Sequence, residues 1–212
     1  MQRLRVRFSR GEELKFIAHL DLMRAWERVL RRAGFDIAYS EGFAPHPRLS
    51  LASPLQVGVI GSNELMDLWL ERWVNPAAFV QDIKGQVPAG LRVLEAKLVS
   101  PDSPSLQSQV RLAEYVVEVE SQEDSQAISR RIMNLLSSAT WPWTHARDRE
   151  QRSYDLRKLI EDIRLLSCQG IVFKLEMLLR CDYSGSGRPE QVVRALGFSR
   201  PPLSIERRTL RF

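Results

Sequence analysis

The spacing of apolar residues along the chain predicts an alternation of strands and amphipathic helices. Residues 4–8 (LRVRF) alternate apolar and polar positions, which is typical of a half-buried strand. Residues 19–33 follow a helical period, with one apolar side and one side of arginines. Gly34 then supplies a plausible C-terminal cap. The apolar side consists of Leu22, Ala25, Trp26, Val29, Leu30 and Ala33.

The rest of the chain repeats this order of elements. In the first half the pattern predicts extended segments at 36–40 and 49–59, a strand at 65–70, a helix at 76–86 and a strand at 91–99. In the second half it predicts a strand at 114–120, a helix at 125–137, extended segments at 144–156 and 171–180, a short helix at 188–196 and a strand at 203–212. Residues 159–166 fit no clear pattern. Each half therefore follows the ferredoxin-like β-α-β-β-α-β order.

We therefore expect an α+β fold made of two ferredoxin-like halves, related by tandem duplication. Residues 1–99 form the first half and residues 111–212 the second. Residues 100–110 between them are rich in Ser and Pro and have no periodicity, so they are predicted to be a linker. The halves share no obvious residue identity, and the duplication rests on the order of elements alone.

Composition indicates an ordinary globular protein. The chain of 212 residues is 44% hydrophobic and 27% charged. Its apolar runs are far shorter than the roughly 18 residues of a membrane helix, and the N-terminus has no signal-peptide core. We expect a cytoplasmic protein with no membrane contact. Cys168 and Cys181 form no CxxC motif, so an intrinsic metal site or iron–sulfur cluster is not predicted, and both are expected to be small hydrophobic residues.

The basic residues are strongly biased toward arginine. Of 31 basic residues, 26 are Arg and five are Lys, for a net charge of +5. Arginine grips phosphate with a planar fork and stacks on bases, so this bias suits nucleic acid. A GC-rich genome would produce the same bias without any functional cause, and composition alone does not separate the two explanations.

A first candidate site lies on the helix at 19–33. Asp21 falls in the first turn, where the positive end of the helix dipole stabilises a carboxylate. His19 lies at the N-terminal end of the helix, where free backbone N–H groups can bind phosphate. The arginines of this helix form one basic stripe: Arg24, Arg28, Arg31 and Arg32. The alternative is that Asp21 caps the helix and the arginines are a solvated face.

A second candidate site is the sequence GFAPHPR at residues 42–48. Pro45 and Pro47 fix the backbone on both sides of His46. Phe43 adds an aromatic stacking plane and Arg48 a cation, a combination that suits a nucleotide or a phosphorylated group. The alternative is a rigid turn whose histidine makes a backbone hydrogen bond.

A weaker candidate is the pair Asp155 and Arg157, which would share one face of a strand. Such a pair is more often a structural ion pair than a site.

The run from Phe16 to Val59 resembles the N-terminal signature of the radical-SAM-linked bacterial domain of unknown function. The resemblance rests on the motifs His19-Leu20-Asp21, Arg24, Arg31-Arg32-Ala33-Gly34, Tyr39-Ser40, Gly42-Phe43, Pro45-His46-Pro47, Pro54-Leu55 and Gly58. Glu64, Asp67 and the run Asp155-Leu156-Arg157 fit later parts of the pattern. The resemblance implies a stand-alone accessory partner of a radical SAM protein, and the gene neighbourhoods of the family favour RNA. It also adds Ser40 to the candidate ligand-binding residues.

Three functions remain open. The first is a non-catalytic module that presents tRNA or rRNA to the radical SAM enzyme. This chain then has no cofactor, and the iron–sulfur cluster and SAM are expected on the partner. The second is a metal-independent endoribonuclease in which His46 or His19 acts as general base and an arginine stabilises the developing charge. The third is a protein–protein adaptor, which would surround the 42–48 loop with an apolar patch.

Overall fold

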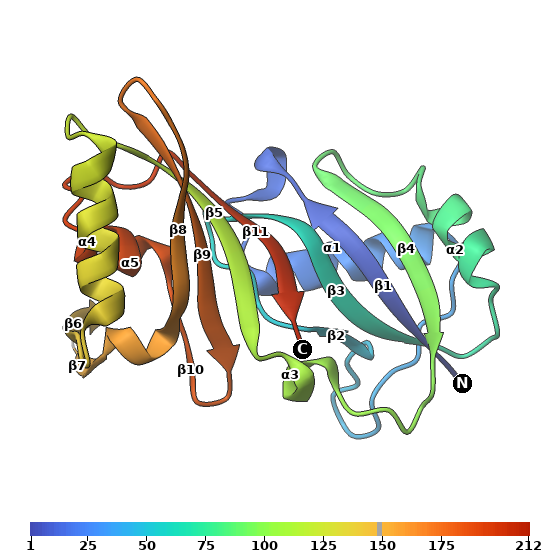
Figure 1. Cartoon of the computed structure of the whole chain (residues 1–212). Coiled ribbons are helices and arrows are strands. Elements are labelled where there is room, and N and C mark those ends of the chain that lie inside the picture. The colour runs from blue at the N-terminus through green and yellow to red at the C-terminus, as the bar shows by residue number, and fades with distance from the viewer. Residues whose placement is uncertain (148–149) are drawn as a thin grey trace. The chain divides into compact units, whose positions relative to one another are not determined.

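The computed structural model describes residues 1–147 and 150–212, and it describes side chains outside residues 145–152. The chain forms two compact units, Met1–Val110 (unit 1) and Arg111–Phe212 (unit 2), which Figure 1 shows in sequence colours. Residues 148–149, which belong to the extended segment predicted at 144–156, lie outside the described residues.

Unit 1 is an antiparallel sheet with its two longer helices packed on one face. Its strands run in the order β4-β1-β3-β2. Along the chain its elements are β1 (Gln2–Arg10), the 3-10 turn η1 (Glu12–Leu14), α1 (His19–Arg32), β2 (Leu49–Leu51), β3 (Ile60–Leu70), α2 (Pro76–Ile83), β4 (Leu91–Val99) and the short α3 (Leu106–Gln109). The strand predicted at the N-terminus and the helix predicted at 19–33 are confirmed.

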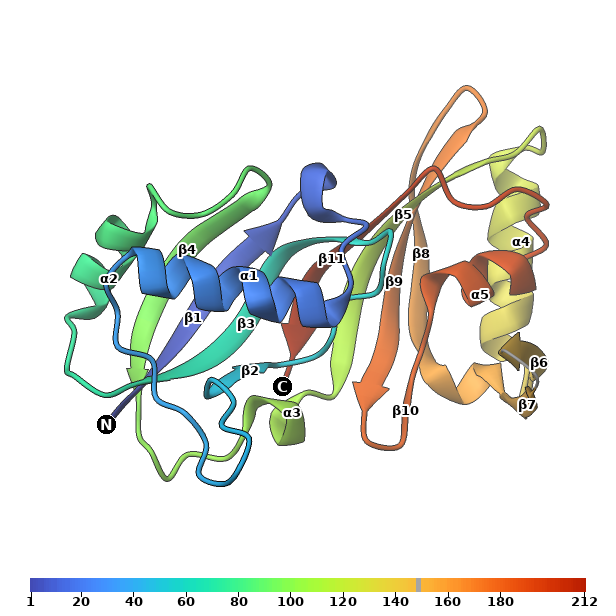
Figure 2. The ribbon, with the colours of Figure 1, turned by 180° about the vertical axis from the view of Figure 1, so that it is seen from behind.

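The core of unit 1 lies between this sheet and α1, which crosses one face of the strands in Figure 2. Alternate residues of β1 and β3 point to this face, since side chains along a strand alternate between its two sides. The buried hydrophobic residues of the two strands are Leu4, Val6, Phe8, Met66, Leu68 and Leu70. Trp26 of α1 is fully buried and packs edge-on against Phe8, with ring centroids 5.0 Å apart. The apolar stripe read from the sequence is therefore what fixes α1 on the sheet.

The helix ends of unit 1 follow local capping chemistry. Gly34 ends α1 with φ 77°, the left-handed conformation that glycine adopts at low cost. Asn75 begins α2, where its side-chain oxygen accepts the amide N–H of Ala77 at 2.9 Å. Pro76 occupies the first helical turn, where a missing N–H costs nothing.

Unit 2 repeats the arrangement with an inserted hairpin. Its main strands run in the order β11-β5-β9-β8, all antiparallel. Its elements are β5 (Leu112–Glu120), α4 (Ser125–Ser137), β6 (Pro142–Arg147), β7 (Glu150–Asp155), the 3-10 turn η2 (Leu156–Leu159), β8 (Ile160–Gln169), β9 (Val172–Asp182), the short β10 (Gly185–Ser186), α5 (Pro189–Ala195) and β11 (Ser204–Arg211). Among the residues that the structure describes, strands β6 and β7 pair only with each other.

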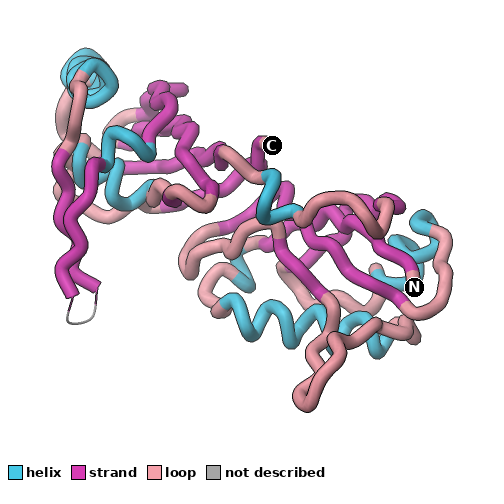
Figure 3. Tube along the Cα trace, turned by 90° about the horizontal axis from the view of Figure 1, so that it is seen from below, coloured by secondary structure: helices cyan, strands magenta, loops and turns pink. Residues whose placement is uncertain are grey.

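The core of unit 2 is built by the same alternation. Every second residue of β5 and β9 is buried: Ala113, Tyr115, Val117, Val119, Phe173, Leu175, Met177 and Leu179. Helix α4 contributes Ile128, Ile132 and Leu135, and α5 contributes Val192 and Val193. Figure 3 distinguishes helices from strands by colour, with the helices in cyan beside the magenta strands.

The structure differs from the sequence prediction in four places. The extended segment predicted at 144–156 is the β6–β7 hairpin, and the unassigned residues 159–166 belong largely to η2 and β8. Of residues 49–59 only Leu49–Leu51 forms a strand. Residues 100–110, predicted to be a linker, include α3, whose Gln107 Nε2 donates to Ser50 Oγ at 2.5 Å and so ties this segment to β2.

Among the residues that the structure describes, no helix has both the length and the apolar character needed to cross a membrane.

Candidate nucleic-acid interface

The outer side of α1 carries all four predicted arginines, which we call the arginine face (Arg24, Arg28, Arg31 and Arg32). All four side chains are exposed, while Leu22, Trp26, Val29 and Leu30 on the other side are buried. The helical period places the two sets apart, because packing of the apolar side against the sheet turns the arginines outward.

Two arginines of this face are neutralised by local acids and two are not. Arg24 pairs with Asp21 at 3.3 Å, and Arg31 pairs with Glu27 at 2.8 Å. Arg28 and Arg32 have no ion pair or hydrogen bond with any other residue that the structure describes. Four arginines against two acids leave an excess of positive charge, and it is concentrated at Arg28 and Arg32.

The second predicted motif forms a short closed loop, which we call the Phe43 loop (residues 40–46). Its ends are joined by two hydrogen bonds: the Ser40 N–H donates to the His46 carbonyl at 2.8 Å, and the His46 N–H donates to Ser40 Oγ at 3.0 Å. Just outside them, Tyr39 and Pro47 form an isolated β-bridge. Ser40, a candidate ligand-binding residue, therefore closes the loop, and the backbone of His46 makes the hydrogen bond expected of a rigid turn.

Tyr39 joins the Phe43 loop to the arginine face. Arg31 Nη2 donates to Tyr39 Oη at 2.6 Å, and the Tyr39 hydroxyl donates to Glu27 Oε1 at 3.1 Å. The hydrogen bond with Tyr39, followed by the nearby charge of Glu27, raises the pKa of Arg31 above its usual value. The loop and the C-terminal half of α1 therefore form one continuous surface. Tyr39 was not among the predicted site residues, although it lies in a motif that the family resemblance had marked.

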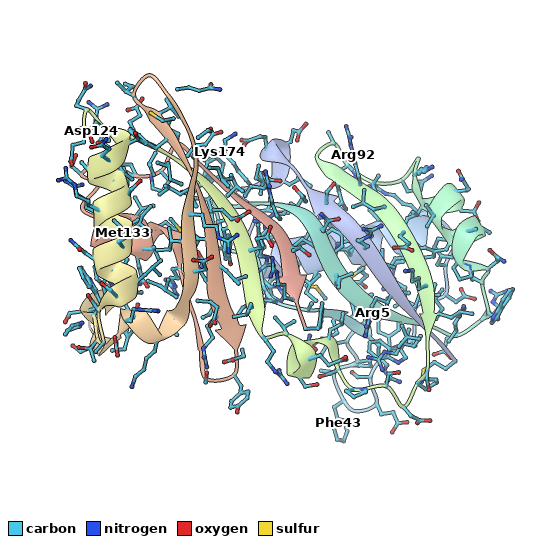
Figure 4. All side chains as sticks on the ribbon, in the orientation of Figure 1. Arg5, Phe43, Arg92, Asp124, Met133 and Lys174 are labelled. Carbon is cyan, nitrogen blue, oxygen red and sulfur yellow. The ribbon has the colours of Figure 1, made fainter. Side chains whose placement is uncertain are left out.

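Phe43 is the most exposed aromatic side chain of this surface. It is exposed to 112% of its reference area, and Figure 4 shows its ring directed away from the ribbon. The His46 side chain is also exposed, and no carboxylate that the structure describes pairs with its imidazole.

Arg48 points away from the arginine face. Leu49 and Leu51 of β2 contribute to the core, so the alternation of side chains directs Arg48 to the opposite face of the sheet, away from α1. On the face away from α1, its guanidinium lies 4.9 Å from the centre of the Trp69 ring, and that of Arg3 lies 5.1 Å from the same ring. The single site predicted from GFAPHPR is therefore divided, with Phe43 and His46 in the loop and Arg48 on the sheet.

His19 and Asp21 lie at the other end of α1. Arg31, which contacts the Phe43 loop through Tyr39, follows His19 by twelve residues, or about 18 Å along the helix axis at 1.5 Å per residue. No contact between His19 and His46 is present in the described part of the structure. The two histidines therefore belong to separate candidate sites. The buried Nδ1 atom of His19 has no hydrogen-bond partner among the described atoms.

Asp155 and Arg157 serve the local structure of unit 2. Asp155 Oδ1 accepts the N–H of Trp141 at 2.8 Å and the N–H of Arg157 at 3.1 Å, which caps η2. The Arg157 guanidinium donates to two backbone carbonyls, of Leu136 at 3.0 Å and of Ile160 at 2.5 Å. The two side chains are thus used in backbone hydrogen bonds and not in the ion pair considered from the sequence.

Glu64 and Asp67, the two acidic residues that fit the family pattern, are buried in unit 1. Asp67, exposed to 1%, accepts hydrogen bonds from Arg3 at 2.6 Å and from Arg5 at 2.9 Å. In the described part of the chain, no group of three or more His, Cys, Asp or Glu side chains is placed to hold a metal ion.

The fold defines a mixed α/β protein with antiparallel sheets in both units. Residues 3–189 match the family described as "Uncharacterized protein conserved in bacteria (DUF2344)", and the chain belongs to this family. No curated protein matches the chain.

Among solved structures, the chain is similar to one in "Crystal Structure of a Cbf5-Nop10-Gar1 Complex", with a TM-score of 0.50 and 11% identity over 96% of this chain and 48% of that chain. It is also similar to one in "Crystal structure of the archaeal box H/ACA sRNP Nop10-Cbf5 complex", with a TM-score of 0.49 and 10% identity over 95% of this chain and 46% of that chain. The chain thus spans about half the length of these relatives, and the first likeness shows a shared fold alone.

Proposed function

We propose that the chain is a non-catalytic RNA-binding module that serves a radical SAM enzyme. The RNA-binding part of the proposal rests on Arg28 and Arg32, which are exposed and make no ion pair or hydrogen bond with the residues that the structure describes. They lie on the same half of α1 as Arg31, which contacts the base of the Phe43 loop through Tyr39. Arginines that are not neutralised by acids attract phosphates, and an exposed aromatic ring offers a stacking plane for a base.

The balance of charges on α1 favours a phosphate-binding surface over a helix face that contacts only solvent. A salt-bridged helix face alternates signs, and Asp21–Arg24 and Glu27–Arg31 follow that pattern at spacings of three and four residues. Arg28 and Arg32 break the pattern. Their charges are available to a phosphate without the loss of an existing ion pair.

The radical SAM part rests on the family resemblance of residues 16–59. In this proposal the iron–sulfur cluster and SAM belong to the partner enzyme, and this chain supplies RNA contacts. We also propose that the two units are ferredoxin-like and arose by tandem duplication. Support comes from their common strand order, in which the first strand lies between the last and the third, and the second strand pairs with the third.

The nuclease, the binding module and the adaptor differ in the role that they give to His46. An endoribonuclease would use His46 or His19 as a general base, so His46→Ala would abolish or strongly reduce cleavage. A binding module would lose at most part of its affinity on the same change. An adaptor would bind its protein partner and no RNA.

The test is a titration of fluorescently labelled total tRNA and of a random single-stranded RNA at low salt, followed by anisotropy. Wild type is compared with Arg28→Ala/Arg32→Ala and with a matched control, Arg130→Ala/Arg194→Ala, which removes two exposed helix arginines of unit 2. Weakening by the first variant and not by the second is expected. Each bound RNA is also run on a denaturing gel with wild type and His46→Ala. Cleavage by wild type that His46→Ala abolishes would replace the binding proposal with the nuclease, and absence of binding would leave the adaptor.

A further inference from the structure

The Phe43 loop presents an aromatic ring that does not pack into the core of unit 1. Phe43 is fully exposed, whereas the core of unit 1 is closed by other residues of α1, β1 and β3. A phenyl ring in water gains nothing for the stability of the fold, since hydrophobic stabilisation requires burial. Its position at the tip of a loop therefore points to contact with another molecule.

The loop is also held in one shape before any ligand arrives. Two hydrogen bonds between Ser40 and His46, at 2.8 and 3.0 Å, close its base. Pro45 restricts the backbone beside His46, and Gly42 takes φ 120°, which other residues rarely adopt. A ring on a preformed loop loses little conformational entropy when it binds a ligand.

The neighbouring charges indicate what the ring contacts. Tyr39 ties the base of the loop to Arg31, so the loop is anchored beside the C-terminal half of α1, which also carries Arg28 and Arg32. These two arginines are one helical turn apart, about 6 Å along the axis of α1. A stacking plane together with two unneutralised cations matches a base and its adjoining phosphates.

We propose that the Phe43 loop selects unpaired nucleotides, with Phe43 stacking on a base while Arg28 and Arg32 hold nearby phosphates. This inference rests on the proposed RNA-binding function. In a duplex both faces of each internal base are covered by its neighbours, so a protruding ring finds no face on which to stack. In single strands, loops and bulges the face is accessible, and stacking there tolerates any base.

The experiment compares three RNA probes of equal length: an oligouridine strand, an abasic strand with the same phosphates, and a perfect duplex. Wild type is expected to bind oligouridine most tightly. Phe43→Ala is expected to weaken oligouridine binding by roughly 5- to 150-fold, the range measured for loss of one base–aromatic stack. It is expected to leave binding of the abasic strand and the duplex unchanged, and Phe43→Tyr is expected to retain the preference.

The matched control is Tyr183→Ala, since Tyr183 lies on a turn of unit 2 and is exposed to 97%. This change is expected to leave all three affinities unchanged. Equal effects of Phe43→Ala on the oligouridine and abasic strands would overturn the inference while leaving RNA binding in place. So would wild-type binding of the duplex as tight as that of oligouridine. Failure of wild type to bind any of the three probes would instead overturn the proposed function, and the inference with it.

Discussion

Replacing Asp67 with alanine tests whether the buried charges of unit 1 depend on one carboxylate. Asp67 is exposed to 1% and Arg3 to 3%, and the two are joined by hydrogen bonds of 2.6 and 3.1 Å. Arg5 adds a further contact at 2.9 Å. Removing one member of such a buried pair leaves an uncompensated charge, which costs about 3–5 kcal/mol.

The expected loss lies near the lower end of that range. Arg3 would keep hydrogen bonds to the carbonyl of Ser103 at 2.6 Å and to that of Pro104 at 3.0 Å, so its guanidinium stays partly satisfied. Glu95→Ala is the matched control, because Glu95 also contacts two basic side chains, Arg7 at 3.1 Å and Lys97 at 2.9 Å, in solvent. Exposed pairs contribute about 0–1 kcal/mol.

The assay is urea unfolding at neutral pH, followed by tryptophan fluorescence and circular dichroism, with the midpoint and slope fitted for each variant. Asp67→Ala is expected to lower the free energy of unfolding by about 3 kcal/mol, and Glu95→Ala is expected to lower it much less. Losses that agree within error would refute the argument that burial makes the Asp67 contacts different.

Single substitutions at three other positions give further testable predictions. Gly42→Ala should weaken RNA binding, and lower the urea midpoint at most slightly, since φ 120° strains only the exposed Phe43 loop; Gly85→Ala, which needs no positive φ, should leave binding unchanged. Asp155→Ala should destabilise unit 2 by about 1–2 kcal/mol through loss of the η2 cap, with RNA affinity unchanged, which calorimetry and anisotropy check. The hydrogen bond from the Ser184 hydroxyl holds the pKa of Asp182 below its usual value. Its stabilisation is therefore present above the unfolded-state pKa and lost as pH falls through the lower, folded pKa, so the difference in unfolding free energy between wild type and Asp182→Asn should shrink on acidification.

The helices and strands that could be predicted from the sequence are those in which the spacing of apolar residues is regular throughout. Helix α1 has a continuous apolar stripe around Trp26 and a glycine directly after its end. Strand β8 could not be found, because its register to β9 shifts between Ile160 and Asp162 and again between Leu165 and Ser167. Each shift inserts a residue and interrupts the period of two on which the prediction depends. The β6–β7 hairpin was likewise read as a single extended segment.

The candidate surface could be predicted only where its residues are close in sequence. The spacing of Arg28 and Arg32 on one helix, and the rigid turn around His46, are local properties. The separation of Arg48 from the loop depends on which face of the sheet β2 presents, and the contact of Tyr39 with Arg31 depends on the path of residues 33–39. Neither is encoded in a short-range pattern.

The most direct test of the RNA-binding proposal is the salt dependence of single-stranded RNA affinity for wild type and Arg28→Ala/Arg32→Ala. Each lost phosphate contact reduces the slope of log affinity against log salt concentration by about 0.7. If Arg28 and Arg32 each hold one phosphate, the slope is shallower by about 1.4 for this variant and unchanged for Arg130→Ala/Arg194→Ala. Identical slopes for wild type and both variants would contradict the proposal, because Arg28 and Arg32 would then hold no phosphate.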